Sequence, residues 1–395
     1  MEVTNQPITP NNTYAPTVLV SNRQEYNPQI FDPTFALAWG LAIRPAGFGG
    51  HFWVAANGSG ASYEYVGDVN IGKPNTIPLF QDDLKLVTVP GPNNTQGTPT
   101  GVVFNRSNNF VITQPYSGGD ITEPSRFLFA TDSGTISAWT ERQNGDGTFD
   151  RAGTAKIVID NSTRGDQYFG LAVNPTGDRL FVANFGVNPN IQVFDGTFKE
   201  ITSSFNGFVN PFVGRDGFQP GEYAPFNIQV LEAPNQAQAS VFVAYAKTQE
   251  NPDNPGQLLV GEEEAGTGLG RIAEFDLTGQ LIRTWEDEGL LNSPWGFAYA
   301  PDDFGGLSDT LLVSNFSDGT ITAFDRNTHQ AIDYMRDTTG QPVIERGIWG
   351  ILFGNGASLG DTNSLYAAIG PEDLGDGVFS RLNYVNLGSG SLPTA

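Results

Sequence analysis

The sequence predicts an all-β fold built from repeated units, and three observations carry this prediction. A short segment, often aromatic-Gly followed by apolar residues, begins at Trp39 and returns five more times along the 395-residue chain. An apolar run that ends in a turn follows each copy. In four copies, a third strand-like segment comes next. Self-similarity of this kind indicates a repeat architecture.

Each repeat is rich in Val, Ile, Phe and Thr, the residues that favour strands. The first segments cover residues 39–43, 100–104, 169–173, 225–229, 295–299 and 349–353. The second segments cover residues 52–57, 127–132, 180–184, 241–245, 311–315 and 365–369. The third segments cover residues 135–139, 191–195, 271–276 and 320–325.

Short strands of this kind must stack on neighbouring repeats to bury their faces. Blades of antiparallel strands around a closed ring leave only short, protected edges. Six repeats therefore predict a six-bladed β-propeller of four-stranded antiparallel blades. The mean period of about 62 residues exceeds the roughly 40 to 50 residues of common propeller repeats. We therefore expect long loops, at 68–97, 142–165, 196–221 and 248–270, where Pro, Gly, Asn and Asp concentrate.

One further apolar stretch, residues 14–20, precedes the first repeat, and the last repeat ends soon after Tyr384. We expect the N-terminal strand, about 14–23, to complete the sixth blade as its outermost strand and so close the ring. The whole chain, 1–395, is then predicted to be a single β-propeller domain with a disordered or extended tail at about 386–395. Closed all-β folds of this length are common as one domain.

The composition argues against several partners. The chain has 43 acidic and 20 basic residues, a net charge of −23, and no cysteine. Such a field repels phosphate backbones and anionic membrane surfaces, and it attracts cations and basic partners. We therefore expect neither nucleic-acid binding nor membrane insertion, since no apolar run approaches the ~18 residues of a membrane span. Without cysteine, disulfides and thiolate metal sites are excluded.

The location of the protein is an inference from composition. After Met1, residues 2–13 are polar and contain no apolar signal core. Few lysines, abundant Gly, Asn and Thr, and the absence of cysteine favour an extracellular or periplasmic protein, with Met1 added to a mature chain.

Several motifs resemble a known group of proteins. Examples are Ala38-Trp-Gly-Leu-Ala42 and Ser293-Pro-Trp-Gly-Phe-Ala298; others lie at 52–60, 97–104, 129–139, 223–229, 243–247 and 348–356. They resemble a family of uncharacterised secreted six-bladed propeller proteins, many of which carry a secretion signal and a PEP-CTERM sorting tail. The resemblance covers about 18–382 and implies the fold but no activity. The chain departs from the family at two places. Ala56 stands where the family more often has a second Asn, and residues 388–395 hold no sorting helix.

More remotely, the repeats are similar to NHL-type and gluconolactonase-like six-bladed propellers. This similarity is one of fold, and a shared fold does not imply a shared function.

In a propeller, the innermost strand of each blade starts where the second strand ends, on one face of the ring. The sequence therefore predicts that tryptophans, amides and one carboxylate gather near the axis at that face. An apolar wall with a few polar groups is typical of a ligand site. The candidate ligand-binding residues are Trp39, Asn57, Asp132, Asn184, Asn227, Lys247, Trp295, Asn315 and Trp349.

An architectural interpretation of the same residues stays open. Aromatic residues at blade starts also wedge neighbouring blades together, and Asn or Asp at a strand end also forms an Asx-turn. Lys247 could hold an anionic ligand, or close a salt bridge to Asp132 or to a loop carboxylate.

A calcium site is the one metal site that the sequence suggests. Residues 144–150, Asn-Gly-Asp-Gly-Thr-Phe-Asp, place oxygen side chains on alternate positions, so Asp146 and Asp150 are candidate calcium ligands. The bidentate Glu of an EF-hand is missing, and a hairpin turn explains the glycines equally well. Residues 262–264 and 371–376 are looser acidic clusters.

Catalytic motifs are absent from the sequence. The two histidines, His51 and His329, have no Ser or Asp partner in any known triad order, and there is no G-x-S-x-G motif. The sequence therefore favours a non-catalytic extracytoplasmic binding or assembly scaffold for a small molecule, protein or polysaccharide. Two alternatives stay open: a calcium-dependent hydrolase or lactonase of the gluconolactonase-like class, and a self-assembling subunit of a surface layer or filament.

Overall fold

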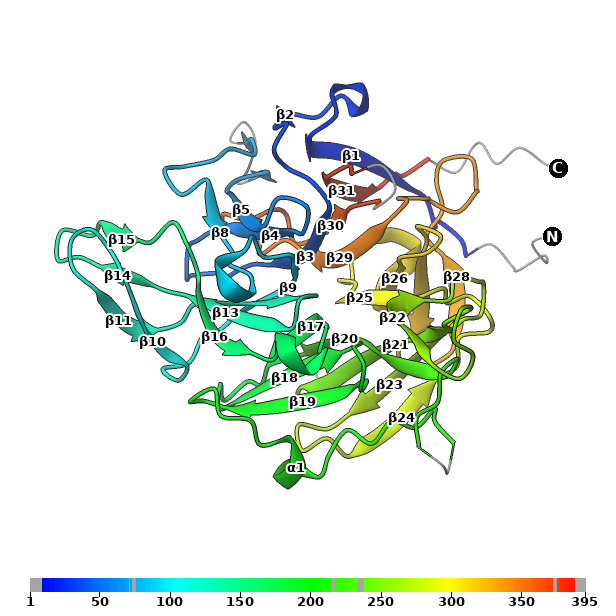
Figure 1. Ribbon diagram of the computed structural model, residues 1–395. Coiled ribbons are helices and arrows are strands. Elements are labelled where there is room, and N and C mark those ends of the chain that lie inside the picture. The colour runs from blue at the N-terminus through cyan, green and yellow to red at the C-terminus, as the bar shows by residue number, and fades with distance from the viewer. Residues whose placement is uncertain are drawn as a thin grey trace.

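The computed structural model describes residues 9–70, 72, 76–214, 217–232, 238–371 and 375–387. Within these ranges, antiparallel sheets are arranged around one axis as six blades (Figure 1), which confirms the predicted fold class. The inner strands are β3 (Ala38–Ala42), β9 (Pro99–Phe104), β17 (Tyr168–Val173), β20 (Tyr223–Leu231), β25 (Pro294–Tyr299) and β29 (Ile348–Phe353). The second strands are β4 (Phe52–Ala56), β12 (Phe127–Thr131), β18 (Arg179–Asn184), β21 (Ser240–Glu250), β26 (Thr310–Asn315) and β30 (Ser364–Ile369).

The outer part of each blade follows the same order. The third strands are β5 (Ala61–Tyr65), β13 (Thr135–Trp139), β19 (Asn190–Asp195), β23 (Gly270–Phe275), β27 (Ile321–Asp325) and β31 (Val378–Tyr384). The fourth strands are β8 (Leu86–Thr88), β16 (Lys156–Asp160), β24 (Leu281–Trp285), β28 (Ala331–Tyr334) and β1 (Tyr14–Ser21).

The third blade differs from the four-stranded expectation. In the described part of the chain its sheet has the order β17-β18-β19. Asp195 ends β19 in a tight turn, in which its Oδ1 accepts hydrogen bonds from the backbone N–H groups of Thr197 and Lys199. The chain then makes a single bridge to Phe194 and enters α1 (Thr202–Phe205) instead of a fourth strand.

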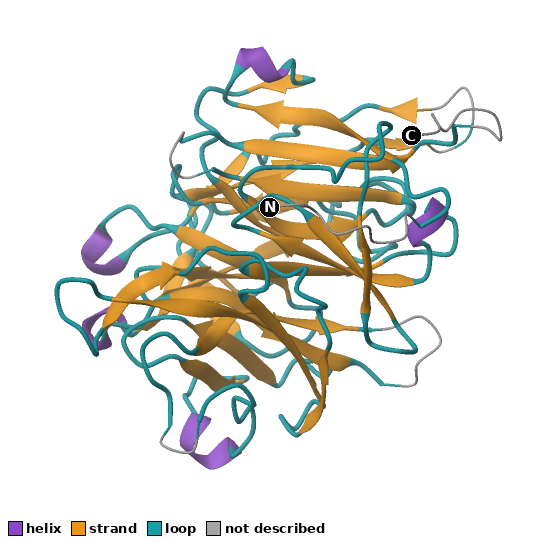
Figure 2. Ribbon diagram, turned by 90° about the vertical axis from the view of Figure 1, so that its right-hand side faces the viewer, coloured by secondary structure: helices purple, strands orange, loops and turns teal. Residues whose placement is uncertain are grey.

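Short elements decorate the ring. Figure 2 shows strands through the body of the molecule and helical turns at its edges. The 3-10 turns are Gln24–Tyr26, Pro92–Asn94, Ser162–Arg164 and Gly305–Leu307. The small strands are β2 (Ile30–Phe31), β6 (Val69–Asn70), β7 (Thr76–Ile77), β10 (Val111–Gln114), β11 (Ile121–Pro124), β14 (Glu141–Gln143), β15 (Phe149–Arg151) and β22 (Leu258–Glu263). The β10–β11 hairpin is an insertion that the sequence repeat did not predict.

The repeated glycine of the inner strands has a packing role. A Cβ added at Gly40 would lie 2.6 Å from the carbonyl oxygen of Thr100, on the next inner strand. A Cβ at Gly350 would lie 2.8 Å from the carbonyl oxygen of Trp39. Glycine at these positions allows neighbouring inner strands to approach closely around the axis.

The ring closes as predicted, because β1 pairs with β31 in antiparallel register from Tyr14 opposite Tyr384 to Ser21 opposite Val378. In Figure 1, β1, from the start of the chain, lies beside β31 from its end. Residues 388–395, most of the predicted tail, lie outside the described residues.

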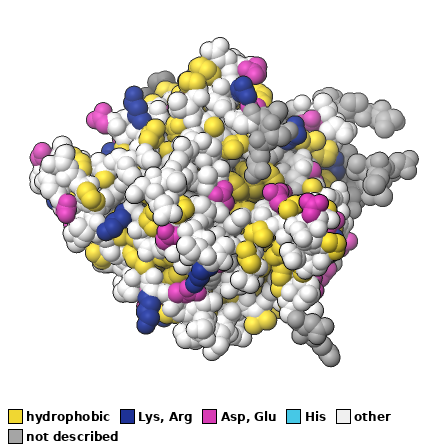
Figure 3. Space-filling model, in the orientation of Figure 1, with side chains coloured by type: hydrophobic (Ala, Val, Ile, Leu, Met, Phe, Trp, Pro, Cys, Tyr) yellow, Lys and Arg dark blue, Asp and Glu magenta, His cyan; other side chains and the backbone are white. Residues whose placement is uncertain are grey.

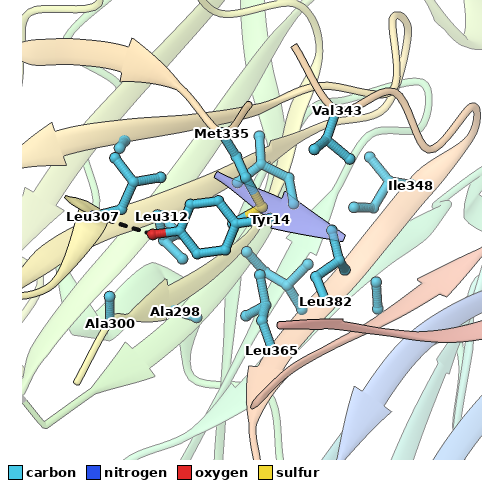
Figure 4. Packing of buried hydrophobic residues seen from close by; sticks show 14 of the residues in the cluster. Tyr14, Ala298, Ala300, Leu307, Leu312, Met335, Val343, Ile348, Leu365 and Leu382 are labelled. Carbon is cyan, nitrogen blue, oxygen red and sulfur yellow. Dashed lines mark hydrogen bonds between the residues drawn. The ribbon is translucent and has the colours of Figure 1, made fainter. Parts of the chain in front are cut away.

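Tyr14 anchors this closure in the core between the fifth and sixth blades. Its ring is fully buried in the cluster of Figure 4, which combines Leu312 of β26 with Leu365 of β30. Its hydroxyl donates to the carbonyl oxygen of Phe304 at 2.5 Å and accepts from the Leu307 N–H at 3.1 Å. One side chain from the start of the chain therefore joins two blades from its end.

A buried carboxyl group in the first blade makes stability depend on pH. Glu64, on β5, is fully buried, and neither carboxyl oxygen has a hydrogen-bond partner in the described part of the structure. Burial raises the pKa of Glu64 well above its usual range. In the unfolded chain the group ionises near pH 4.3. As the pH rises above that value, the unfolded state loses the proton that the folded state keeps, so the free energy of unfolding falls.

We therefore expect Glu64→Gln, which keeps the shape of the neutral carboxyl, to lose less stability than the wild type between pH 5 and pH 8. Urea unfolding at both pH values measures this difference. Over that range, the slope contributed by Glu64 is at most about 1.4 kcal/mol per pH unit. Parallel pH profiles of the two proteins would contradict the assignment.

Candidate functional site

The starts of the inner strands bring an aromatic cluster to the axis. Trp39, Phe169, Trp295 and Trp349 belong to one buried cluster with Phe226, and each of the four is at most 5% exposed. Trp39 stacks on Trp349 with ring centroids 3.8 Å apart, and Trp295 meets Trp349 edge-on at 6.1 Å. Side chains from five of the blades thus fill the axis at this end. We call this end of the ring the entrance face.

A hydrogen bond ties the cluster together across the ring. The indole Nε1 of Trp295 donates to the carbonyl oxygen of Phe169 at 3.2 Å. The indole Nε1 of Trp39 is buried and has no hydrogen-bond partner among the described residues. A buried donor without a partner costs free energy.

A cavity of about 270 Å³ lies over this cluster, and we call it the entrance pocket. Its lining comprises Trp39, Asp132, Gln167, Phe169, Val260, Gly261, Glu262, Glu263 and Trp349. The aromatic rings come from the starts of inner strands, whereas residues 260–263 belong to β22. In Figure 3, hydrophobic side chains lie near the middle of the ring, with acidic side chains close to them. The accessible lining of the pocket is thus mostly polar, with three carboxyl groups above aromatic rings that are almost fully buried.

Asp132 is the innermost of these carboxyl groups. One oxygen accepts a hydrogen bond from Asn57 Nδ2 at 2.9 Å, and the other accepts from the hydroxyl of Thr98. Burial raises the pKa of Asp132, and these two hydrogen bonds oppose that shift. A cationic ligand beside Asp132 would favour the ionised carboxylate further.

Two predicted site residues are engaged in hydrogen bonds within the protein. Asn315 is fully buried; its amide donates to Leu290 O, Thr320 Oγ1 and Thr322 Oγ1, and its Oδ1 accepts from the Asn292 N–H. These bonds fasten the loop that precedes β25 to the fifth blade.

Asn184 likewise makes hydrogen bonds within the protein, in the third blade. Its Oδ1 accepts from the backbone N–H groups of Gln167 and Gly186, and its amide donates to Asp166. Neither Asn184 nor Asn315 lines the entrance pocket.

Asn227 and Lys247 also lie outside the pocket lining. Asn227 Nδ2 donates to the carbonyl oxygen of Trp295 at 2.7 Å, which joins the inner strands of the fourth and fifth blades. Lys247 Nζ lies 2.7 Å from Glu264 Oε2. Lys247 therefore closes a salt bridge to a loop carboxylate, which is one of the interpretations that the sequence left open.

The hairpin with Asp146 and Asp150 has the geometry of a turn. Asp146 Oδ1 accepts from the N–H and hydroxyl of Thr148, while Asp150 Oδ2 lies 2.5 Å from Arg142 Nη2. A guanidinium already neutralises Asp150, which disfavours a cation there. Among the described residues, no group of three or more His, Asp or Glu side chains could hold a metal ion. Calcium at this hairpin therefore stays a prediction.

The sequence repeat did not predict the contribution of β22. This strand pairs with the far end of β21, which extends to Glu250 and so carries its partner over the entrance face. The only feature of the sequence that pointed to this strand was the acidic run at 262–264, inside a predicted loop. It indicated negative charge but not that the segment lies over the entrance face.

Comparison with known proteins identifies relatives of this chain. No protein-family model matches it. The chain is 30% identical over 346 residues to the uncharacterized protein R648 of Acanthamoeba polyphaga mimivirus, an alignment covering 86% of this chain and 73% of R648. It is 25% identical over 376 residues to the uncharacterized protein L690 of the same virus, covering 94% of this chain and 86% of L690.

One solved structure shares the fold, and a second is reported for comparison. A protein of unknown function from Bacteroides thetaiotaomicron superposes with a TM-score of 0.50 at 10% identity, covering 94% of this chain and 76% of the other. A luciferin-regenerating enzyme superposes with a TM-score of 0.47 at 12% identity, covering 90% and 92%. Likeness at this level of identity concerns architecture and not activity.

Proposed function

The chain belongs to the family of the uncharacterized protein R648 of Acanthamoeba polyphaga mimivirus. From this premise, we propose that it is a binding propeller that captures a basic segment of a partner protein at its entrance face. The observation that carries the proposal is the entrance pocket, where Asp132, Glu262 and Glu263 border an aromatic cluster. Carboxylates in a small pocket complement the charge of a protonated lysine or arginine side chain.

The size of the pocket favours one inserted side chain over a free metabolite. Pockets for drug-sized ligands occupy about 300–1,000 Å³, and the entrance pocket measures about 270 Å³.

An apolar groove continues from the pocket and extends the same surface. Its volume is about 570 Å³, and its lining includes Val187, Phe218 and Leu258. Val260 of β22 lines both cavities and is 38% exposed. A partner segment with a basic residue next to apolar residues would fill both. The net charge of −23 would speed the encounter with such a partner.

The calcium-dependent lactonase alternative receives no support from the geometry. Aromatic side chains occupy the axial position where such a centre would need converging oxygen ligands. His51 and His329 do not line the entrance pocket.

The proposal includes a location outside the cytoplasm, which rests on the composition alone. Within the described residues, no helix has the length and apolarity that crossing a bilayer requires. Fractionation of the source cells with an antibody against the chain tests the location, and recovery in the cytoplasmic fraction would refute it.

We expect a synthetic peptide that carries one lysine between two leucines to bind the protein and to change its tryptophan fluorescence, because Trp39 and Trp349 line the pocket. Glu262→Gln should weaken binding about tenfold, since a charge-assisted hydrogen bond contributes about 1.5–3 kcal/mol. Affinity should fall as salt rises. Titration calorimetry measures both effects.

The matched control is Glu25→Gln. Glu25 is exposed in a 3-10 turn away from the pocket, and its substitution changes the net charge by the same amount. Equal loss of affinity in both variants would show that only the overall field attracts the peptide. A peptide with glutamate in place of lysine that binds equally well would refute the proposal.

A further inference from the structure

The opposite end of the ring, where the inner strands end, carries two adjoining cavities. The first, about 380 Å³, opens along the axis, and its walls include Leu41, Leu171 and Leu231 from three inner strands. The second, about 440 Å³, lies between the first and second blades. Phe104 and Arg106 line both cavities. We call the first the exit funnel and the second the arginine cleft.

The arginine cleft concentrates positive charge. Arg44, Arg106 and Arg126 line it, with Glu141 as the only carboxylate of its lining residues. The chain as a whole carries more than twice as many acidic as basic residues. Three guanidinium groups in one cleft therefore oppose the general charge of the protein.

The existing ion pairs leave part of this charge uncompensated. Glu141 is shared, since Arg44 Nη2 lies 2.5 Å from one oxygen and Arg151 Nε lies 3.1 Å from the other. Arg106 pairs with Glu232 at 3.0 Å, but both side chains are about half exposed or more, so water screens this pair. In the part of the chain that the structure describes, the half-buried Arg126 side chain makes no ion pair or hydrogen bond.

Aromatic side chains accompany these charges. Phe48 is 57% exposed and Phe149 is 40% exposed, and both line the cleft. Phe48 meets Phe104 edge-on, with ring centroids 6.1 Å apart. Phe104 then leads into the exit funnel, where apolar side chains alternate with polar ones such as Asn227, Gln229 and Glu232. Exposed rings beside guanidinium groups are suited to a flat or apolar body that carries an anionic group.

We infer that the exit funnel and the arginine cleft form a second binding site, for a small organic anion with an apolar body. The carboxylate, sulfonate or phosphate group of the ligand binds Arg126 and Arg106, and its apolar part lies against Phe48 and Phe104 and extends into the funnel. This site is separated from the entrance pocket by the aromatic cluster, and it does not depend on the proposed function of that pocket.

Two fluorescent dyes test the inference. Anilinonaphthalene sulfonate carries an apolar aromatic body and an anion, and phenylnaphthylamine has nearly the same body without the anion. We expect the sulfonate to bind the folded protein more tightly than the neutral dye, despite the net charge of −23. Arg126→Gln should weaken sulfonate binding about tenfold and leave binding of the neutral dye nearly unchanged.

Two further variants keep the test decisive. Arg142→Gln is the matched control, because Arg142 lies on the same strand as Glu141 but pairs with Asp150 outside the cleft lining. Phe48→Ser, at an exposed position, should weaken both dyes. Glu262→Gln should affect neither dye, which separates this site from the entrance pocket. Equal affinity of the wild type for the two dyes, or an equal loss in the Arg126 and Arg142 variants, would overturn the inference.

Discussion

Deletion of residues 1–22 is expected to abolish stable folding, because it removes β1 from the last blade. The loss would leave β31 as an unpaired edge, and exposed strand edges promote aggregation. It would also empty the core site of Tyr14, and truncation of a buried aromatic residue alone costs about 3–5 kcal/mol. Leu19 and Val20, both fully buried, would be lost as well. Together, the loss of strand pairing and of these buried side chains approaches the whole free energy of unfolding of a typical domain, about 5–15 kcal/mol.

Differential scanning calorimetry and light scattering measure this outcome. A chain shortened only by residues 1–8 is the control, since it retains all of β1. Tyr14→Ala in the full chain isolates the anchoring side chain, and it should lower the melting temperature while the ring still closes. A protein without residues 1–22 that melts like the full chain would show that β1 does not hold the ring closed.

Trp349→Ala is expected to cost about 3–5 kcal/mol of unfolding free energy, as truncations of buried aromatic residues do. The ring of Trp349 stacks between Trp39, at 3.8 Å, and Phe316, at 3.7 Å, and it is 2% exposed. Its removal would leave a void at the axis between the first, fifth and sixth blades. Trp349→Phe keeps part of these contacts and should cost clearly less.

Guanidinium unfolding of both variants measures the difference. Phe31→Ala is the control for loss of an aromatic side chain at an exposed position, where Phe31 is 44% exposed, and it should change stability by no more than about 0.5 kcal/mol. An equally small effect of Trp349→Ala would refute the architectural role. If Trp349→Ala folds, it should also lose peptide binding, because the ring lines the entrance pocket.

The candidate site could be predicted only in part. Trp39 and Trp349, at strand starts, and Asp132, after a strand end, line one pocket, since strand order alone decides which ends share a face. Asn315 met the same positional criterion and yet lies fully buried among loop and strand partners. Position along a strand does not specify which way a side chain turns when a neighbouring loop offers hydrogen bonds.

The sequence by itself determined the number of blades, the inner strands and the ring closure through residues 14–21. These features repeat or alternate locally, and apolar periodicity reports them directly. Tertiary structure alone decided where β22 places Glu262, how Arg142 neutralises Asp150, and that Arg44, Arg106 and Arg126 share one cleft. These residues are distant in sequence or lie in irregular segments. Their meeting depends on loop paths and on contacts between blades, for which no local pattern exists.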